Sequence, residues 1–109
     1  MNIAFGDERL RELCERQRIA ERRLGAPCAR KLRTRLADLQ AASSVTELVA
    51  GRPHPLVGDR AGQFAVDLEG GRRLVFVPGH DPVPRRDDGS FDWPLVTKVR
   101  IVYVGDYHD

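Results

Sequence analysis

The order of apolar and polar residues divides the chain into a helical first half and a strand-rich second half. Residues 2–5 form a short alternating run, which is typical of a strand. After Asp7, apolar residues recur every three or four positions with Arg and Glu between them, which predicts one helix ending at Gly25. Pro27 suits the first turn of a second helix, so a helical hairpin is expected. The apolar stripe of this second helix comprises Cys28, Ala29, Leu32, Leu36 and Leu39.

The second half predicts a three-stranded meander. Residues 63–68 alternate between apolar and other side chains, and Gly70 and Gly71 form the turn into a second strand at 72–77. A long surface loop is expected at 78–94, and the last and longest strand at 96–104. Before these strands, the capping-box spacing of Ser44 and Glu47 predicts one short helical turn. These elements indicate a single α+β domain spanning 1–109, with the helical hairpin on one face of a largely antiparallel sheet and the other face left for a ligand.

Composition supports this interpretation and excludes several classes of protein. With 41% hydrophobic and 31% charged residues, the chain resembles a soluble globular domain. No apolar run approaches the roughly 20 residues of a membrane span. The first residues lack a basic region followed by an apolar stretch, so we expect no signal peptide and a cytoplasmic location. Cys14 and Cys28 lack the spacing of a metal site and are expected to be buried thiols.

Charge is distributed unevenly along the chain. Residues 1–42 contain ten Lys or Arg and six Asp or Glu, whereas residues 43–109 contain eight basic and ten acidic residues. A basic helical half could face phosphates or an acidic partner. It could equally be an ordinary solvated surface in which residues four positions apart form ion pairs.

Two segments combine residue types suited to RNA cleavage without a metal. The last predicted strand stops at Gly105 and is followed by Asp106, Tyr107 and His108, while His54 precedes the strand at 63–68. Such cleavage needs a base for the 2′-hydroxyl, cations for the charged phosphorane and an acid for the leaving oxygen. Histidine can serve as base or acid near neutral pH, arginine binds phosphate through a planar fork, and an aromatic ring stacks on a base. Considered alone, His54 could also be a simple turn residue before Pro55.

The same segments resemble the RelE/ParE toxin superfamily, and within it the HigB-type toxins, over nearly the whole chain. The likeness is strongest in the segment from His54 to Gly62, in the hairpin at 63–76 and in the closing Asp106-Tyr107-His108. It implies a RelE-like fold and the toxin of a type II toxin–antitoxin system. Such a toxin is a metal-independent, cofactor-free endoribonuclease, an mRNA interferase that cuts mRNA on the 70S ribosome and inhibits translation. The implied protein partner is a HigA-type helix-turn-helix antitoxin.

The resemblance also implies which residues form the site. The catalytic set falls on His54, Arg73, Asp106, Tyr107 and His108. His54 and His108 would share proton transfer, Arg73 would clamp the scissile phosphate, Tyr107 would stack or orient, and Asp106 would position a histidine or act as base. Further RNA contacts are expected from basic residues near these segments, namely Arg60, Arg72, Arg85, Arg86, Lys98 and Arg100.

One position departs from the family pattern and keeps two other functions open. Val57 stands where many HigB-type toxins carry a lysine, so a phosphate-binding cation is missing there. This favours a degenerate, non-catalytic protein that retains only antitoxin binding. The other alternative is a ParE-like gyrase inhibitor, which shares the fold but performs no RNA chemistry. Trp93 is interpreted as a loop anchor against the core and His80 as an exposed loop residue.

Overall fold

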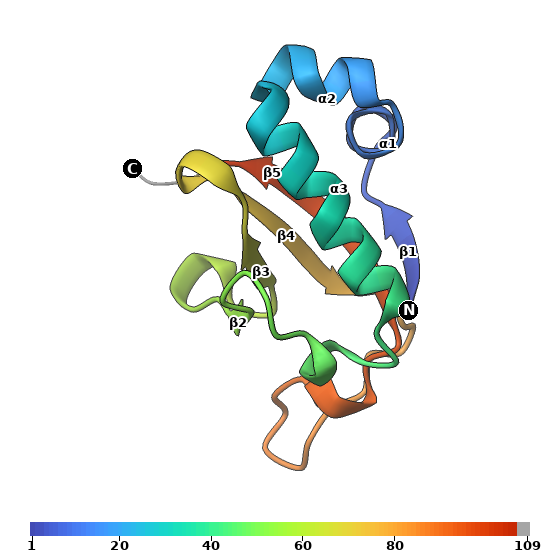
Figure 1. Ribbon diagram of the computed structural model, residues 1–109. Coiled ribbons are helices and arrows are strands. Elements are labelled where there is room, and N and C mark those ends of the chain that lie inside the picture. Colours follow the sequence, from blue (N-terminus) through green and yellow to red (C-terminus); the bar gives the residue numbers. More distant parts are fainter. Residues whose placement is uncertain (107–109) are drawn as a thin grey trace.

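The computed structural model describes residues 1–106 and contains three helices and one five-stranded sheet in that range (Figure 1). The strands are ordered β1-β5-β4-β3-β2; β1 runs parallel to β5, and the other neighbours are antiparallel. The predicted α+β class and the largely antiparallel sheet are therefore confirmed. The elements follow in the order β1 (Asn2–Phe5), α1 (Glu8–Glu15), α2 (Gln17–Leu24), α3 (Ala26–Ala41), β2 (His54–Pro55), β3 (Phe64–Asp67), β4 (Arg73–Pro78) and β5 (Lys98–Gly105).

The prediction of one continuous helix at residues 8–24 is wrong. The helix breaks at Arg16, whose backbone is extended with φ −113° and ψ 107°, so that α1 and α2 run in different directions (Figure 1). After the break α2 packs on α3, and Ala20 and Leu24 join the hydrophobic core. Helix stability in proteins comes mainly from such packing, which here overrides the local periodicity.

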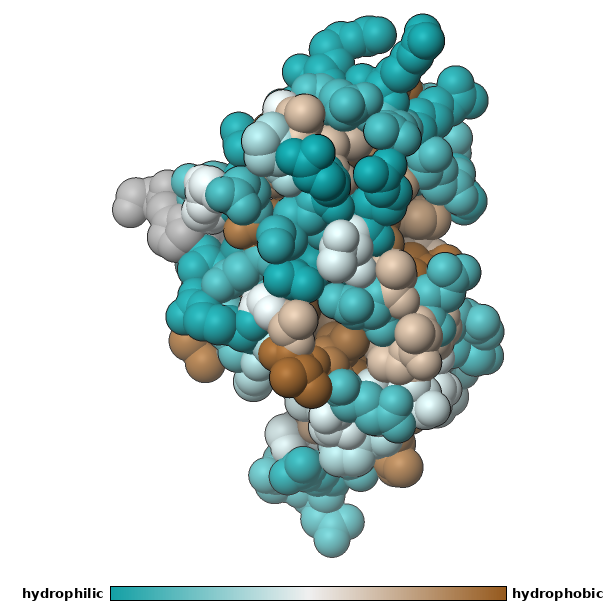
Figure 2. Space-filling model, in the orientation of Figure 1, coloured by the Kyte–Doolittle hydropathy of each residue, from teal (hydrophilic) through white to brown (hydrophobic). Residues whose placement is uncertain are grey.

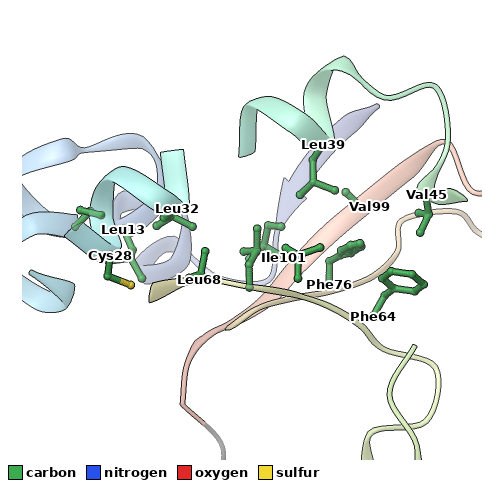
Figure 3. Packing of buried hydrophobic residues seen from close by; sticks show 14 of the residues in the cluster. Leu13, Cys28, Leu32, Leu39, Val45, Phe64, Leu68, Phe76, Val99 and Ile101 are labelled. Carbon is green, nitrogen blue, oxygen red and sulfur yellow. The ribbon is translucent and has the colours of Figure 1, made fainter. Parts of the chain in front are cut away.

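The core lies between α3 and one face of the sheet (Figure 3). Leu32 and Leu39 of the predicted apolar stripe are completely buried, as are Phe76 and Ile101 on the central strands. Phe64 stacks on Phe76 with ring centroids 5.5 Å apart. Burying side chains of this size typically stabilises a fold by about 1.5–3 kcal/mol each.

Both ends of α3 are fixed by backbone features. Gly25 precedes the helix with φ +84°, and Pro27 lies in its first turn, as predicted. At the other end, the α-amino group of Met1 donates hydrogen bonds to the carbonyls of Leu39, Gln40 and Ala42 at 3.0, 2.8 and 2.7 Å. These contacts satisfy carbonyls that the helix leaves open and place a positive charge at its negative end. They also fix the start of β1 against α3.

The connections differ in part from the predictions. Val45–Glu47 forms the expected short turn, as a 3-10 helix, but Glu47 accepts a hydrogen bond from the backbone of Ser43 rather than Ser44. The edge strand β2 was not predicted, because two residues are too few to show periodicity. The long loop at 78–94 contains its own small hairpin, in which Arg85 pairs with Phe91. Trp93 packs edge-on against Phe64, with 4.9 Å between ring centroids, and so anchors this loop to the core as predicted.

Candidate active site on the open face of the sheet

The candidate site lies on the face of the sheet turned away from the helices, called here the open face. Side chains alternate along a strand, so the neighbours of the core residues point to this face. His54, Ala65, Val75 and Tyr103 are successive partners across β2, β3, β4 and β5 and therefore form one row there. At about 4.8 Å per strand, His54 and Tyr103 stand roughly 14 Å apart. Ala65 and Val75 are completely buried, so neighbouring groups cover the sheet between them.

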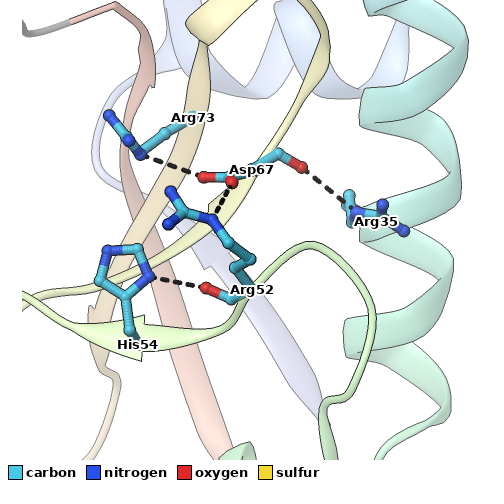
Figure 4. Close-up of polar contacts among 5 residues, drawn as sticks. All are labelled: Arg35, Arg52, His54, Asp67 and Arg73. Atoms are coloured by element: carbon cyan, nitrogen blue, oxygen red, sulfur yellow. Dashed lines mark hydrogen bonds and ion pairs between the residues drawn. The ribbon is translucent and has the colours of Figure 1, made fainter.

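Asp67 is the centre of the polar contacts beside this row (Figure 4). Its Oδ1 accepts a hydrogen bond from Nε of Arg73 at 3.1 Å, and its Oδ2 accepts one from Nε of Arg52 at 2.6 Å. Its backbone carbonyl accepts a third from Nε of Arg35 on α3, at 3.2 Å. One acidic residue thus connects the helical layer, the β3–β4 hairpin and the segment before β2.

The environment of Asp67 favours its ionised form. Partial burial would by itself raise the pKa of this carboxyl, but the hydrogen bonds and positive charges of Arg52 and Arg73 outweigh it and lower the pKa below its ordinary value. The side chain of Arg73 is only 15% exposed, whereas that of Arg52 is 70% exposed. Asp67 therefore holds one largely buried and one exposed guanidinium at the same carboxylate.

His54 joins this network through Arg52 (Figure 4). Nδ1 of His54 lies 2.6 Å from the backbone carbonyl oxygen of Arg52. Within residues 1–106, Arg52 is the one non-glycine residue with a positive φ, at +48°. The preceding Gly51 accepts a hydrogen bond from the backbone N–H of Asp67 at 2.6 Å. His54 and Arg73, selected from two separate segments of the sequence, thus belong to one connected set of contacts.

A second group of contacts lies at the β5 end of the row. The guanidinium of Arg60 lies over the ring of Tyr103, 5.1 Å from its centroid, and the phenol of Tyr103 donates to the backbone carbonyl of Asp106 at 3.0 Å. A Cβ added to Gly71 would lie 3.7 Å from a carboxylate oxygen of Asp106. The Asp106 side chain is therefore beside the β3–β4 turn. Tyr107 and His108 lie outside the residues that the structure describes.

The remaining basic residues expected to bind RNA are spread more widely. Lys98 and Arg100 are exposed on the open face of β5, and Arg72 is half-buried just before β4. Arg85 and Arg86 border a groove of about 550 Å³, whose other wall includes Pro55 and Leu56, the two residues that follow His54. Arg85 also lies over the ring of Phe91, 4.8 Å from its centroid. These five residues therefore flank the central row rather than forming part of it.

Two further positions bear on the chemistry. Val57 is 84% exposed, at the start of the 3-10 turn Gly58–Arg60, so a longer side chain would meet no packing constraint there. His80 is half-buried rather than exposed as predicted, because its Nε2 accepts a hydrogen bond from the backbone N–H of Thr97 at 2.9 Å.

In the part of the chain that the structure describes, no three His, Cys, Asp or Glu side chains are grouped to hold a metal ion. No helix in the same range could span a bilayer.

Sequence reasoning did not select Arg52, Asp67 or Tyr103. The pairing of Asp67 with Arg73 could have been found, because a turn centred on Gly70 places these two residues opposite each other. Tyr103 could not have been found from alternation, which would place it on the core face with Ile101, because the irregular pairing near Val102 turns it to the open face instead. No sequence signal marks the positive φ of Arg52 beyond its place between Gly51 and Pro53.

No family model and no curated protein matches the sequence. The fold, however, matches solved structures along their whole length. A YoeB/ParE toxin from Agrobacterium tumefaciens has a TM-score of 0.60 and 15% identity, covering 99% of this chain and 100% of that one. A YoeB–YefM complex and a YoeB dimer, both from Staphylococcus aureus, have TM-scores of 0.57 and 0.55 at 16% identity, each covering 100% of this chain and 98% of theirs. The chain therefore has the fold of the YoeB/ParE toxins, which confirms the predicted RelE-like architecture.

Proposed function

We propose that this protein is the toxin of a type II toxin–antitoxin system and cuts mRNA on the ribosome. Fold alone does not define an activity. The observation that carries the proposal is the connection of His54 and Arg73, through Arg52 and Asp67, on the open face of a sheet with a YoeB/ParE-type fold. A histidine that can move a proton and a partly buried arginine that can bind phosphate are two of the three groups that metal-free cleavage of a phosphodiester needs.

In the proposed reaction, His54 accepts the proton of the attacking 2′-hydroxyl. Arg73 neutralises charge on the phosphate as the pentavalent state forms, because its guanidinium is held in a fixed orientation by Asp67. Protonation of the leaving 5′-oxygen is assigned to His108, with Asp106 and Tyr107 as its neighbours. This last assignment rests on the family resemblance, since residues 107–109 are outside the described range.

Binding to the ribosome is assigned to basic surfaces. Arginines on all three helices are exposed, and hydrophilic side chains cover the end of the molecule formed by α1 and α2 (Figure 2). Such a surface attracts phosphates, and binding that depends on it weakens steeply as salt rises. The exposed set comprises Arg9, Arg11, Arg16, Arg18, Arg22, Arg23, Arg30 and Arg33.

A protein antitoxin is the second proposed partner. One of the similar structures is a YoeB–YefM complex, that is, a toxin of this fold bound to a second protein. For this chain we propose a HigA-type helix-turn-helix antitoxin. The HigB-type subclass remains a prediction from the sequence resemblance.

The proposal is tested by expressing the chain alone and mapping the 5′ ends of cellular mRNA. The expected result is growth arrest with new cuts inside translated reading frames, relieved by co-expressing the protein encoded next to the toxin gene. Arrest with DNA-damage signalling and no mRNA cuts would instead identify a gyrase inhibitor. Normal growth at a confirmed level of soluble protein that still binds its neighbour would identify a non-catalytic binding protein.

A further inference from the structure

We infer that Arg52 is a positioning residue that sets the protonation pattern of the His54 ring and the orientation of Arg73. Arg52 lies outside the three segments in which the likeness to known toxins is strongest. The part of this inference that concerns catalysis rests on the proposed function. The part that concerns the His54 ring is a property of the isolated protein and can be measured without any substrate.

The contact between His54 and Arg52 decides which ring nitrogen carries the proton. A carbonyl oxygen can only accept a hydrogen bond, so Nδ1 of His54, 2.6 Å from the carbonyl of Arg52, must be the donor. In the neutral ring, Nε2 then has no proton and presents its lone pair. A free histidine side chain favours the opposite tautomer, with hydrogen on Nε2. The contact therefore holds the ring in the form in which Nε2 can accept a proton from a 2′-hydroxyl.

The position of this carbonyl depends on the rare backbone conformation of Arg52. Its φ of +48° is uncommon for a residue with a side chain and turns the peptide that follows it towards His54. Two contacts with Asp67 hold the segment there: Gly51 accepts from the backbone of Asp67 at 2.6 Å, and Nε of Arg52 donates to Oδ2 of Asp67 at 2.6 Å. A Cβ on Gly51 would lie 2.6 Å from Nε of Arg35, so a side chain there would displace Arg35 from the carbonyl of Asp67.

The same residue acts on Arg73 through the shared carboxylate. Arg52 and Arg73 bind different oxygens of Asp67, so each fixes the rotation of the carboxylate that the other uses. The ion pair of Arg52 is largely exposed and by itself adds little stability. Its role is therefore geometric: it connects the backbone that orients His54 to the carboxylate that orients Arg73.

The test uses ¹⁵N NMR of histidine-labelled protein, because protonated and unprotonated ring nitrogens have well-separated chemical shifts. At a pH where the rings are neutral, His54 is expected to show a protonated Nδ1 and an unprotonated Nε2. A His54→Gln variant assigns the signals. His80 is a matched internal control, since its Nε2 accepts hydrogen bonds from the backbone of Thr97 and Lys98, so it should show the same tautomer without any contact to Arg52.

Two variants separate positioning from folding. Arg52→Gly suits the left-handed backbone and removes the whole side chain with its guanidinium, while Arg52→Lys retains a cation for Asp67. Arg52→Gly should shift the His54 signals towards the Nε2–H form and leave His80 unchanged. It should lower single-turnover mRNA cleavage on ribosomes by about 10- to 100-fold, without weakening ribosome binding, as expected when a reacting group is misplaced. Arg52→Lys should show a smaller shift of the His54 signals and a smaller loss of cleavage rate than Arg52→Gly.

Several results would overturn the inference. A wild-type His54 ring protonated on Nε2 excludes the proposed contact. Arg52→Gly with unchanged His54 signals shows that Arg52 does not set the protonation of the ring, and an unchanged cleavage rate shows that Arg52 does not position the reacting groups. If the wild-type protein cuts no mRNA while its His54 signals behave as expected, the proposed function fails and the assignment of the His54 tautomer stands.

Discussion

Asp67 and Arg73 face each other across the β3–β4 hairpin, with 3.1 Å between Oδ1 of the carboxylate and Nε of the guanidinium. The pairing places a largely buried arginine on the open face at a fixed angle. A guanidinium held in this way is prepared for phosphate before any substrate arrives, so little reorganisation is needed as charge develops.

Replacing Arg73 with alanine should therefore lower single-turnover mRNA cleavage on ribosomes by about 100-fold, the typical loss when one preorganised donor is removed. Arg73→Lys should be intermediate, because a lysine retains the charge but lacks the planar fork. Arg30→Ala is the matched control at ribosome concentrations that saturate binding: it removes the same charge from an exposed position on α3 that is proposed to act in ribosome binding alone. Equal rates for Arg73→Ala and Arg30→Ala would show that Arg73 contributes only to the overall charge.

The lowered pKa of Asp67 makes a prediction about acid stability. Because the carboxyl has a lower pKa in the folded protein than the ordinary 3.8, its ionised form stabilises the fold fully above that value. This contribution is lost as the pH falls through the folded-state pKa. Urea unfolding of the wild type and Asp67→Asn should therefore give a free-energy difference that is constant at neutral pH and shrinks below the ordinary carboxyl pKa. A difference independent of pH down to acid unfolding would contradict this.

The core makes a prediction about stability that is independent of function. Leu39 is completely buried against the sheet, whereas Leu95 is 58% exposed. Leu39→Ala should lower the free energy of unfolding by about 2–5 kcal/mol, while the same substitution at Leu95 should change it by less than about 0.5 kcal/mol. Urea denaturation measures both. Similar losses for the two variants would mean that α3 does not cover the sheet as described.

Much of the fold could be predicted from the sequence, because the longer helices and strands repeat their pattern of apolar and polar residues several times. The stripe on α3 and the alternation around the Gly70 turn each extend over several side chains, and both appear in the structure. The break at Arg16 and the edge strand at His54–Pro55 could not be predicted. The first goes with the packing of α2 on α3, which local periodicity does not reveal, and the second is too short to carry a period.

The candidate site, like the fold, could be predicted from the sequence only in part. His54 was noted for its chemistry and Arg73 was assigned through the family resemblance, but nothing in their spacing says that Arg52 and Asp67 connect them. That connection depends on the left-handed backbone of one residue and on the register of a hairpin. The register of the hairpin follows from the turn and can be derived from the sequence. A positive φ, however, runs against the backbone preference of arginine and is imposed by the surrounding structure.

Val57→Lys should increase cleavage. A lysine at this exposed position adds a cation three residues after His54 and disturbs no packing. Since an exposed charge interaction is worth up to about 1 kcal/mol, we expect a gain of about two- to fivefold. Val49→Lys, at a valine that is 88% exposed, adds the same charge elsewhere and should have a smaller effect. An unchanged or lower rate for Val57→Lys would show that another cation already serves this position.

The most direct test of the central claim is single-turnover cleavage of a defined mRNA, free and bound to programmed ribosomes, by the wild type, His54→Ala and the control His80→Ala. The wild type is expected to cut ribosome-bound mRNA and to leave free mRNA intact. His54→Ala, folded and bound to ribosomes, is expected to be slower by at least about 100-fold, within the range for loss of a general base, and His80→Ala is expected to cut at close to the wild-type rate. Wild-type protein that saturates ribosomes without cutting, or His54→Ala cutting as fast as the wild type, would contradict the central claim.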